Sequence, residues 1–301
     1  MKPSALKYIL ITPARNEEAY IELTILSVIK QTIRPVRWVI LSDGSTDRTD
    51  EIAQKYAALH DWIDFHRLPQ RDSRDFAGKA RGFNLGYERA KHLEHDLVCS
   101  LDADISFDEG YFEFLLGKFD ENPRLGLGGT PYSENGKTYD YRFASIEHVS
   151  GACQMFRRES FEAIGGYVPV KGGGIDLIAV LSVRMKGWET RTFPEVVCIH
   201  HRPMGSANDK NVIVSTFKLG ERGYRLGFHP LWQIFRSVNY MRKKPYLVGG
   251  CALGSGYFWA WLRRVERPIS PELKEFQQRD QMKRLRHFFG IGRKTGNPSS
   301  R

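Results

Sequence analysis

The chain has 301 residues, of which 41% are hydrophobic and 27% are charged, and its formal net charge is +10. This length allows one large domain or two modest ones, and it can bury a core without a disulfide or zinc staple. The composition is that of a soluble globular enzyme and excludes collagen-like and disordered classes. Four widely spaced cysteines form no CxxC pair, which predicts thiols in a reducing compartment: Cys99, Cys153, Cys198 and Cys251.

The part of the chain before Thr130 alternates short apolar runs with helical patterns. Ile21, Ile25 and Val28 recur at helical spacing, and a second helix is expected to begin after Ser45-Thr46-Asp47. Strand and helix in alternation predict an α/β fold with a mainly parallel, doubly wound sheet covered on both faces. The expected strands are Tyr8 to Ile11, Trp38 to Leu41, Trp62 to Phe65, Leu97 to Leu101 and Leu125 to Leu127.

Three polar clusters directly follow three of these strands: Pro13 to Glu18, Ser42 to Asp47, and Asp102-Ala103-Asp104. Open parallel sheets bind their ligands at the carboxyl ends of the strands. We therefore expect the three clusters to converge on one edge of the sheet, although the sequence separates them widely.

Asp102 and Asp104 stand two residues apart, so their carboxylates point to the same side of an extended segment. Two carboxylates so placed repel each other unless a cation lies between them, and oxygen ligands suit Mg²⁺ or Mn²⁺. An Asx turn that closes the strand is the alternative. Asp43, before a glycine, has the chemistry to bind a nucleobase or ribose, or it belongs to an ordinary capping loop. Arg15 and Glu17 either contact a nucleotide or cap the following helix.

The segments ITPARNEEAYIELTILSVIKQT, LSDGSTDRTDEIA and SLDADISF, in this order, resemble the nucleotide-sugar-binding half of a family 2 glycosyltransferase with the GT-A fold. The resemblance covers residues 7 to 205. It implies an inverting transfer from a nucleotide-activated sugar, usually a UDP-sugar, assisted by a divalent metal. It also implies that Asp104 binds the metal and that the donor is bound by Pro13, Ala14, Arg15, Glu17, Asp43, Lys79 and Asp102. A solvated helix face is the alternative for Lys79.

The same resemblance assigns the catalytic base to Asp176, although Ile175 stands where the family usually has a glutamate. The helix expected from Asp176 to Met185 offers another interpretation, in which this aspartate is only an N-cap. His200 and His201 end a strand expected from Glu195, and alternation sends their rings to opposite faces. The resemblance favours His201 as the metal ligand; a packed histidine is the alternative. Arg157 and Arg158 are expected on a solvated helix face; contact with the diphosphate is the alternative.

The basic charge is concentrated at the C-terminal end. Residues 216–301 hold 18 basic and 5 acidic residues, whereas residues 1–215 hold 27 and 30. Residues 245–262 carry no charge, contain four glycines and are flanked by basic residues on both sides. This pattern predicts a re-entrant or interfacial contact with an anionic membrane; a buried helix or oligomer contact is the alternative. No nucleic-acid-recognition motif is present, so nucleic acid is not expected as a partner.

These observations predict a GT-A catalytic domain over residues 1–210, with a nucleotide-sugar half over about 1–130 and an acceptor half over about 131–210. A basic, aromatic helical extension over 211–289 and a disordered tail over 290–301 follow. The expected enzyme is a cytoplasmic glycosyltransferase of the bacterial type, peripheral to the inner face of the membrane. It would transfer a sugar to a glycan or lipid-linked acceptor. The alternative is a noncatalytic GT-A-like scaffolding subunit. A nucleotidyltransferase is disfavoured because residues 13–18 contain no glycine.

Overall fold

The computed structural model describes residues 4–69, 76–134, 136, 145–170, 172–202 and 211–290. The chain divides into two compact units, Met1–Ser206 and Ala207–Arg301. The predicted domain boundary at residue 210 falls outside the described residues, as does the predicted tail over 290–301 except for Gly290.

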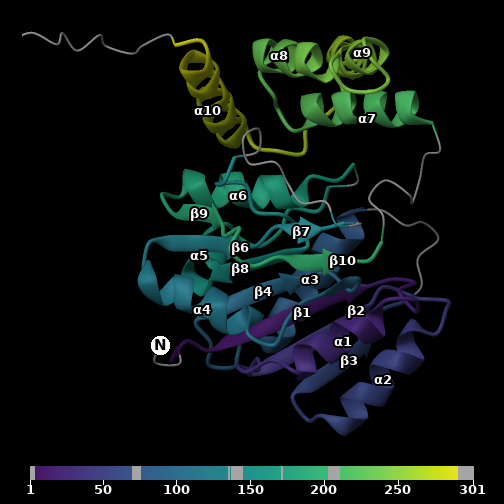
Figure 1. The fold of residues 1–301 in the computed structure, drawn as a ribbon, viewed down its shortest axis with the longest axis vertical. Helices are drawn as coiled ribbons and strands as arrows, with labels where there is room; N and C mark the ends of the chain where they lie inside the picture. Colours follow the sequence, from purple (N-terminus) through teal and green to yellow (C-terminus); the bar gives the residue numbers. More distant parts are fainter. Residues whose placement is uncertain are drawn as a thin grey trace, which may run out of the picture. The chain divides into compact units, whose positions relative to one another are not determined.

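A seven-stranded sheet forms the centre of the first unit, in the order β3-β2-β1-β4-β8-β6-β9 (Figure 1). Strands β1, β2, β3 and β4 run parallel, and β8 is antiparallel to both β4 and β6. All five strands predicted from apolar runs are present, so the mainly parallel sheet is confirmed. The strands are β1 (Tyr8–Ala14), β2 (Arg37–Ser42), β3 (Ile63–Arg67), β4 (Leu97–Leu101), β6 (Leu125–Gly129), β8 (Cys153–Arg157) and β9 (Glu189–Thr192).

A second, three-stranded sheet contains β5 (Ile105–Ser106), β10 (Cys198–His200) and β7 (Tyr132–Ser133), with β10 in the middle. The strand predicted from Glu195 begins only at Cys198. Pro194 and Glu195 form a turn instead, a conformation that proline favours because its φ angle is restricted. Strand β10 thereby carries His200 beside β5, which directly follows the Asp102–Asp104 cluster.

Helices cover both faces of the central sheet, as expected for a doubly wound fold. Side chains alternate along each strand, so Tyr8 and Leu10 pack with α1 and α4 while Ile11 faces α3. A Cβ at Gly86 would lie 2.6 Å from Ile11, so only glycine allows α3 to approach the sheet this closely. The helices are α1 (Ile21–Ile29), α2 (Thr49–Leu59), α3 (Phe76–Ala90), α4 (Tyr111–Glu121), α5 (Arg158–Ala163) and α6 (Ile175–Met185).

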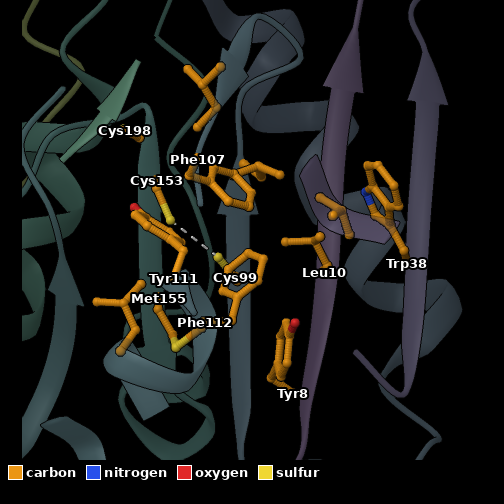
Figure 2. Close-up of a cluster of buried hydrophobic side chains, with 14 of the residues drawn as sticks. Tyr8, Leu10, Trp38, Cys99, Phe107, Tyr111, Phe112, Cys153, Met155 and Cys198 are labelled. Atoms are coloured by element: carbon orange, nitrogen blue, oxygen red, sulfur yellow. Dashed lines mark hydrogen bonds between the residues drawn. The ribbon is translucent and has the colours of Figure 1, made fainter. Parts of the chain in front are cut away.

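The main core joins β1, β2, β4 and β8 to the aromatic residues around α4, as Figure 2 shows for Tyr8, Leu10, Tyr111 and Phe112. The Cys99 and Cys153 sulfur atoms lie 3.7 Å apart here as free thiols, although β4 and β8 are distant in the chain. Burial raises the pKa of the Cys99 thiol, with a further contribution from Cys153. Together with Cys198 these cysteines behave as core residues, whereas Cys251 is exposed.

The second unit is helical, as predicted. It consists of α7 (Val212–Arg225), α8 (Pro230–Tyr240), α9 (Val248–Leu262) and α10 (Pro271–Phe288). Helix α9 packs against α7 and α8 through glycines. Among the described residues, no helix combines the length and the apolar character needed to cross a membrane.

Candidate functional site

The first two polar clusters meet at the carboxyl ends of β1 and β2. The Asp43 backbone N–H donates to Ala14 O at 2.8 Å, and Arg15 forms an ion pair with Asp43 at 3.7 Å. Asn16 adopts a positive φ of 54°, and its side chain accepts a hydrogen bond from the Thr46 N–H at 2.9 Å. Because β1 and β2 are parallel neighbours, loops that lie far apart in sequence are joined into one rim.

Helix α2 begins at Thr49, directly after the predicted capping segment, but its N-cap is Arg48, which makes no side-chain capping bond. Asp47 accepts a hydrogen bond from the Thr49 N–H at 3.0 Å, and Thr49 Oγ1 accepts one from the Glu17 N–H at 2.7 Å. Asp47 thus stabilises the start of α2 from the position before its N-cap. Glu17 is buried and its carboxylate pairs with Arg202. A purely capping role for Glu17 does not account for this pairing, because its carboxylate is directed toward the end of β10.

The third cluster lies at the end of β4 and is held by β8 and α3. The Asp102 N–H donates to Ala152 O at 2.9 Å, and the Asp102 carboxylate forms an ion pair with Lys79. Lys79 also donates to Gly151 O at 2.9 Å. Lys79 is thus not on a solvated helix face: it projects from α3 into the acidic edge of the sheet.

Asp176 reaches the same place from the start of α6. The N-cap of this helix is Gly174, whose φ of 92° is a left-handed conformation that glycine adopts without steric penalty. A Cβ on Gly151 would lie only 3.3 Å from the Asp176 Cβ, so the glycine lets the aspartate approach β8. The N-cap interpretation of Asp176 is therefore wrong, because Gly174 occupies that position and Asp176 lies in the first turn.

The pKa values of Lys79 and Asp102 are shifted by the neighbouring carboxylates. Burial opposes the charge of Lys79, but the negative charges of Asp102, Asp176 and Asp104 outweigh it and raise the Lys79 pKa. Burial also raises the pKa of Asp102; Lys79 opposes this rise, and Asp104 adds to it. Three carboxylates from the end of β4 and the start of α6 therefore act on one lysine.

The side chains of His200 and His201 point in different directions, as strand alternation predicts. His200 Nε2 lies 3.7 Å from Asp104 Oδ1, and its buried Nδ1 has no hydrogen-bond partner within the described part of the chain. His201 Nε2 instead hydrogen-bonds Ser106 Oγ at 2.8 Å, and its ring stacks near Tyr20. His201 was expected to lie beside Asp104 as a metal ligand, but the side chain that approaches Asp104 is that of His200.

Arg202 is a site residue that the sequence reasoning missed. Its Nε lies 3.4 Å from Asp104 Oδ2, it pairs with Glu17, and its guanidinium lies 5.8 Å from the Tyr20 ring centre. Arg202 thereby links the end of β4 to the loop after β1. A basic residue directly after the histidine pair was the available signal.

The structure also places Pro13 and the arginine pair Arg157 and Arg158. Pro13 lies within β1, opposite Leu41, and contacts α3 near Gly82, so it belongs to the sheet rather than to the loop beyond it. Arg157 is not solvated as expected: it donates to the backbone carbonyls of Phe119, Asn122 and Leu125. Arg158 does lie at the surface and pairs with Glu162.

A divalent cation fits the donor set at Asp104. Among the described residues, no group of three or more His, Cys, Asp or Glu side chains could hold a metal by itself. Mg²⁺ is commonly held by one or two carboxylates together with substrate phosphates, so a partial set is what a nucleotide-linked site requires. Asp104 offers carboxylate oxygen, and the imidazole Nε2 of His200 lies 3.7 Å from Asp104 Oδ1, so an oxygen and a nitrogen donor stand side by side.

Comparison with known proteins identifies the fold that builds this edge. Residues 9–151 match the model of Glycosyl transferase family 2. This part of the chain is therefore similar to a family 2 glycosyltransferase domain. The resemblance of the three motifs is therefore confirmed, and the domain holds the loops after β1, β2 and β4. Asp176, His200 and Arg202 lie beyond the matched residues.

Curated relatives of the domain are polysaccharide synthases. The chain is 27% identical over 218 residues to the poly-beta-1,6-N-acetyl-D-glucosamine synthase of Staphylococcus aureus strain COL. A synthase of the same name from Staphylococcus epidermidis is 26% identical over 186 residues, 61% of this chain and 42% of that protein. The Staphylococcus aureus alignment covers 72% of this chain and 46% of the synthase, so the chain spans about half the length of these relatives.

Solved structures establish the GT-A fold. The mannosyltransferase PcManGT from Pyrobaculum calidifontis, in complex with GDP-Man and Mn²⁺, superposes with a TM-score of 0.56 at 17% identity, covering 96% of this chain and 87% of its own. Staphylococcus aureus TarS 1-349 in complex with UDP-GlcNAc gives 0.53 at 14% identity, covering 90% and 78%. At these identities the likeness concerns the fold alone.

Proposed function

We propose that this protein transfers a sugar, with inversion, from a nucleotide-sugar donor to a hydroxyl group of a glycan or lipid-linked acceptor. The observation that carries the proposal is the arrangement at the carboxyl edge of the sheet: Lys79 pairs with Asp102 and donates to Gly151 O, and Gly151 lies against Asp176. Asp104 follows Asp102 by two residues at the same edge. A scaffold would have no need to gather three acids at one place, since like charges at close range destabilise the folded state. In a glycosyl transfer, by contrast, one carboxylate can bind a metal cation and another can accept the proton of the acceptor hydroxyl.

Asp176 is the proposed general base. Attack on the anomeric carbon requires loss of the acceptor hydroxyl proton, and a positioned carboxylate takes such a proton with a typical gain of about 10²–10⁴-fold. Asp176 comes from α6, across the acidic edge from the loops after β1 and β2. A donor bound by those loops would present its anomeric carbon between the leaving diphosphate and Asp176, which is the arrangement that inversion needs.

Asp104 and His200 are the proposed metal residues, in place of the expected pair of Asp104 and His201. A bound Mg²⁺ or Mn²⁺ would neutralise charge on the departing diphosphate as a Lewis acid. Arg202 lies 3.4 Å from Asp104 and has the charge to bind the same diphosphate. Lys79 holds Asp102 and the backbone of Gly151 in place.

The donor half of the site is the rim formed after β1 and β2. Asp43 and Arg15 lie side by side there, Ala14 ends β1 and accepts a hydrogen bond from the Asp43 N–H, and Glu17 follows in the loop. A carboxylate beside a guanidinium matches the hydrogen-bond donors and acceptors of a nucleobase and its ribose. UDP-N-acetylglucosamine is the first donor to test because the curated relatives are named for polymers of N-acetylglucosamine. Action at the cytoplasmic face of the membrane belongs to the same proposal.

A panel of UDP- and GDP-sugars tests the function. Purified protein with Mg²⁺ or Mn²⁺ should release nucleoside diphosphate from one donor family, faster when an oligosaccharide acceptor is present. Asp176→Asn should lower this turnover by about a thousandfold, within the range expected for a general base, and leave donor binding measurable by calorimetry. Asp64→Asn is the matched control because Asp64 lies on β3 and pairs with the surface residue Arg37.

The alternative of a noncatalytic binding subunit predicts a different result. This alternative is supported if a nucleotide sugar binds but no donor is turned over. It is also supported if the Asp176→Asn variant turns over a donor as fast as the parent protein does. A failure of every donor to bind would remove both interpretations of the acidic edge.

A further inference from the structure

Helix α9 has one face buried in the second unit and one face of exposed apolar side chains. The exposed positions recur at helical spacing along its length and, with Leu247 directly before the helix, form the α9 stripe: Leu247, Val248, Cys251, Phe258, Trp259 and Leu262. Phe258, Trp259 and Leu262 are 41%, 50% and 69% exposed. Aromatic and aliphatic side chains of this size are seldom left in water together unless they contact something else.

The buried face explains why the stripe is not core. A Cβ at Gly220 would lie 2.0 Å from Leu253 O, and one at Gly256 would lie 2.0 Å from Phe217 O. Helices α7 and α9 therefore meet backbone to backbone, and Gly250 allows the same approach to α8. Small residues supply most of the buried face of α9, alongside Leu253 and Tyr257, so its other large apolar side chains are directed outward.

Helix α8 repeats the pattern. Gln233 and Ser237 are buried toward α9, and Gln233 donates to Leu253 O at 3.2 Å. Leu231, Ile234 and Val238 are instead 53%, 46% and 52% exposed. Polar residues inside and apolar residues outside reverse the usual arrangement of a soluble helix.

The charge around these helices selects the partner. Residues 230–265 contain six basic residues and no acidic one. Arg242, Lys243 and Lys244 are exposed just before α9, and Arg263 and Arg264 are exposed just after it. An apolar stripe with cationic residues at both ends is complementary to a surface that is apolar in depth and anionic above, which is the interface of an acidic lipid bilayer.

The two basic clusters, residues 242–244 and residues 263–264, also determine how α9 can be oriented in a membrane. Helix α9 has 15 residues, about 22 Å at about 1.5 Å per residue, whereas the hydrocarbon core is about 30 Å thick. If α9 stood upright, one cluster would be drawn into hydrocarbon, which is strongly unfavourable for arginine and lysine. Both clusters reach headgroups only when the helix lies parallel to the membrane plane.

We propose that α9 lies flat in one leaflet of an anionic membrane, with the α9 stripe in the acyl boundary and both basic clusters at the headgroups. Trp259 then lies where tryptophan is most favourable, at the boundary between lipid and water. This membrane contact belongs to the second unit and does not depend on the proposed transferase activity.

The exposed Cys251 lies in the α9 stripe and is a natural site for a label, since the other three cysteines are buried. A nitroxide on Cys251 should become inaccessible to a water-soluble relaxation agent when vesicles of phosphatidylcholine mixed with phosphatidylglycerol are added. Vesicles of phosphatidylcholine alone should have a much weaker effect. Cys251→Ser provides the background that shows labelling is confined to this thiol.

Depth measurements along the helix test the orientation. Val248→Cys, Ser255→Cys and Trp259→Cys, each in the Cys251→Ser background, should give labels at equal depth, because their positions lie on one face. A steady change in depth from residue 248 to residue 259 would mean an upright or re-entrant helix and would overturn the proposal.

Charge removal tests the partner. The triple variant Arg242→Gln, Lys243→Gln, Lys244→Gln should weaken binding to the anionic vesicles by about a hundredfold, since each basic residue contributes roughly tenfold or less near such a surface. The control triple variant Lys55→Gln, Arg89→Gln, Lys91→Gln removes equal charge from α2, α3 and the residue after α3 and should bind normally. Absence of vesicle binding by the unmodified protein, or a Cys251 label already shielded without vesicles, would overturn the proposal and show that protein covers the stripe.

Discussion

The two compact units use apolar residues in opposite ways. In the first, the charge-free strands β1 and β4 are buried on both faces, and Leu10 and Cys99 have no exposed surface. In the second, the charge-free helix α9 turns its glycines inward and leaves Trp259 half exposed. Both segments are apolar along the chain, so it is the packing of neighbouring elements that decides whether an apolar run becomes core or surface.

The contrast also separates the chemistry. The carboxylates that surround Lys79 come from the first unit, whereas the six basic residues without acidic neighbours lie in the second, within residues 230–265. Substitutions in one unit are therefore expected to leave the measured property of the other unchanged.

The largest contrast is expected between two leucines. Leu10→Ala removes a fully buried side chain from the sheet core and should lower the free energy of unfolding by about 2–5 kcal/mol. Leu262→Ala removes a side chain that is 69% exposed and should change it by less than about 0.5 kcal/mol. Urea unfolding of both variants measures the difference. Equal losses would mean that the α9 stripe is core after all.

Adding one methyl group to α9 at Gly256 is expected to cause the next largest loss of stability. Gly256→Ala places a Cβ against Phe217 O and should destabilise the α7–α9 contact by about 1–3 kcal/mol. Gly254→Ala is the control: its Cβ would lie 3.4 Å from Ser237 Oγ, an ordinary contact, so helix propensity should stabilise it slightly. Hydrogen exchange of α7 distinguishes the two variants. Nucleotide affinity should not change in either.

A smaller effect than these two losses of stability is expected from the proposed metal residues of the first unit. Asp104→Asn should raise the Mn²⁺ concentration needed for half-maximal UDP binding by about tenfold, because a carboxylate charge is lost. Isothermal calorimetry with Mn²⁺ and UDP provides the readout, and vesicle binding should stay constant.

The two histidines sharpen the same measurement. His200→Gln should shift the metal requirement more than His201→Gln, because the His200 side chain lies beside Asp104 while that of His201 bonds Ser106. The reverse order would restore the original choice of histidine.

The apolar runs before Thr130 were sufficient to predict five of the seven strands of the central sheet, and the order of the motifs indicated the GT-A fold; β8 and β9 lie beyond these runs. A buried parallel strand needs a continuous apolar run, and a polar loop begins where the run stops. The ends of such strands can therefore be located from the sequence alone. Asp43, Asp102 and Asp104 could be placed at one edge for that reason. Arg202 could not, because its contact with Asp104 depends on β10 pairing with β5, which brings His200 opposite Ile105.

The amino-acid sequence alone determined the order of the strands along the chain, the polar residues at their ends and the charge imbalance between the two units, because each follows from local periodicity or composition. Only the tertiary structure decided that Lys79 enters the acidic edge, that His200 rather than His201 approaches Asp104 with its side chain, and that Trp259 and its neighbours in the α9 stripe point outward. Each of these depends on which element packs beside which, and that is set by contacts between residues far apart in the chain.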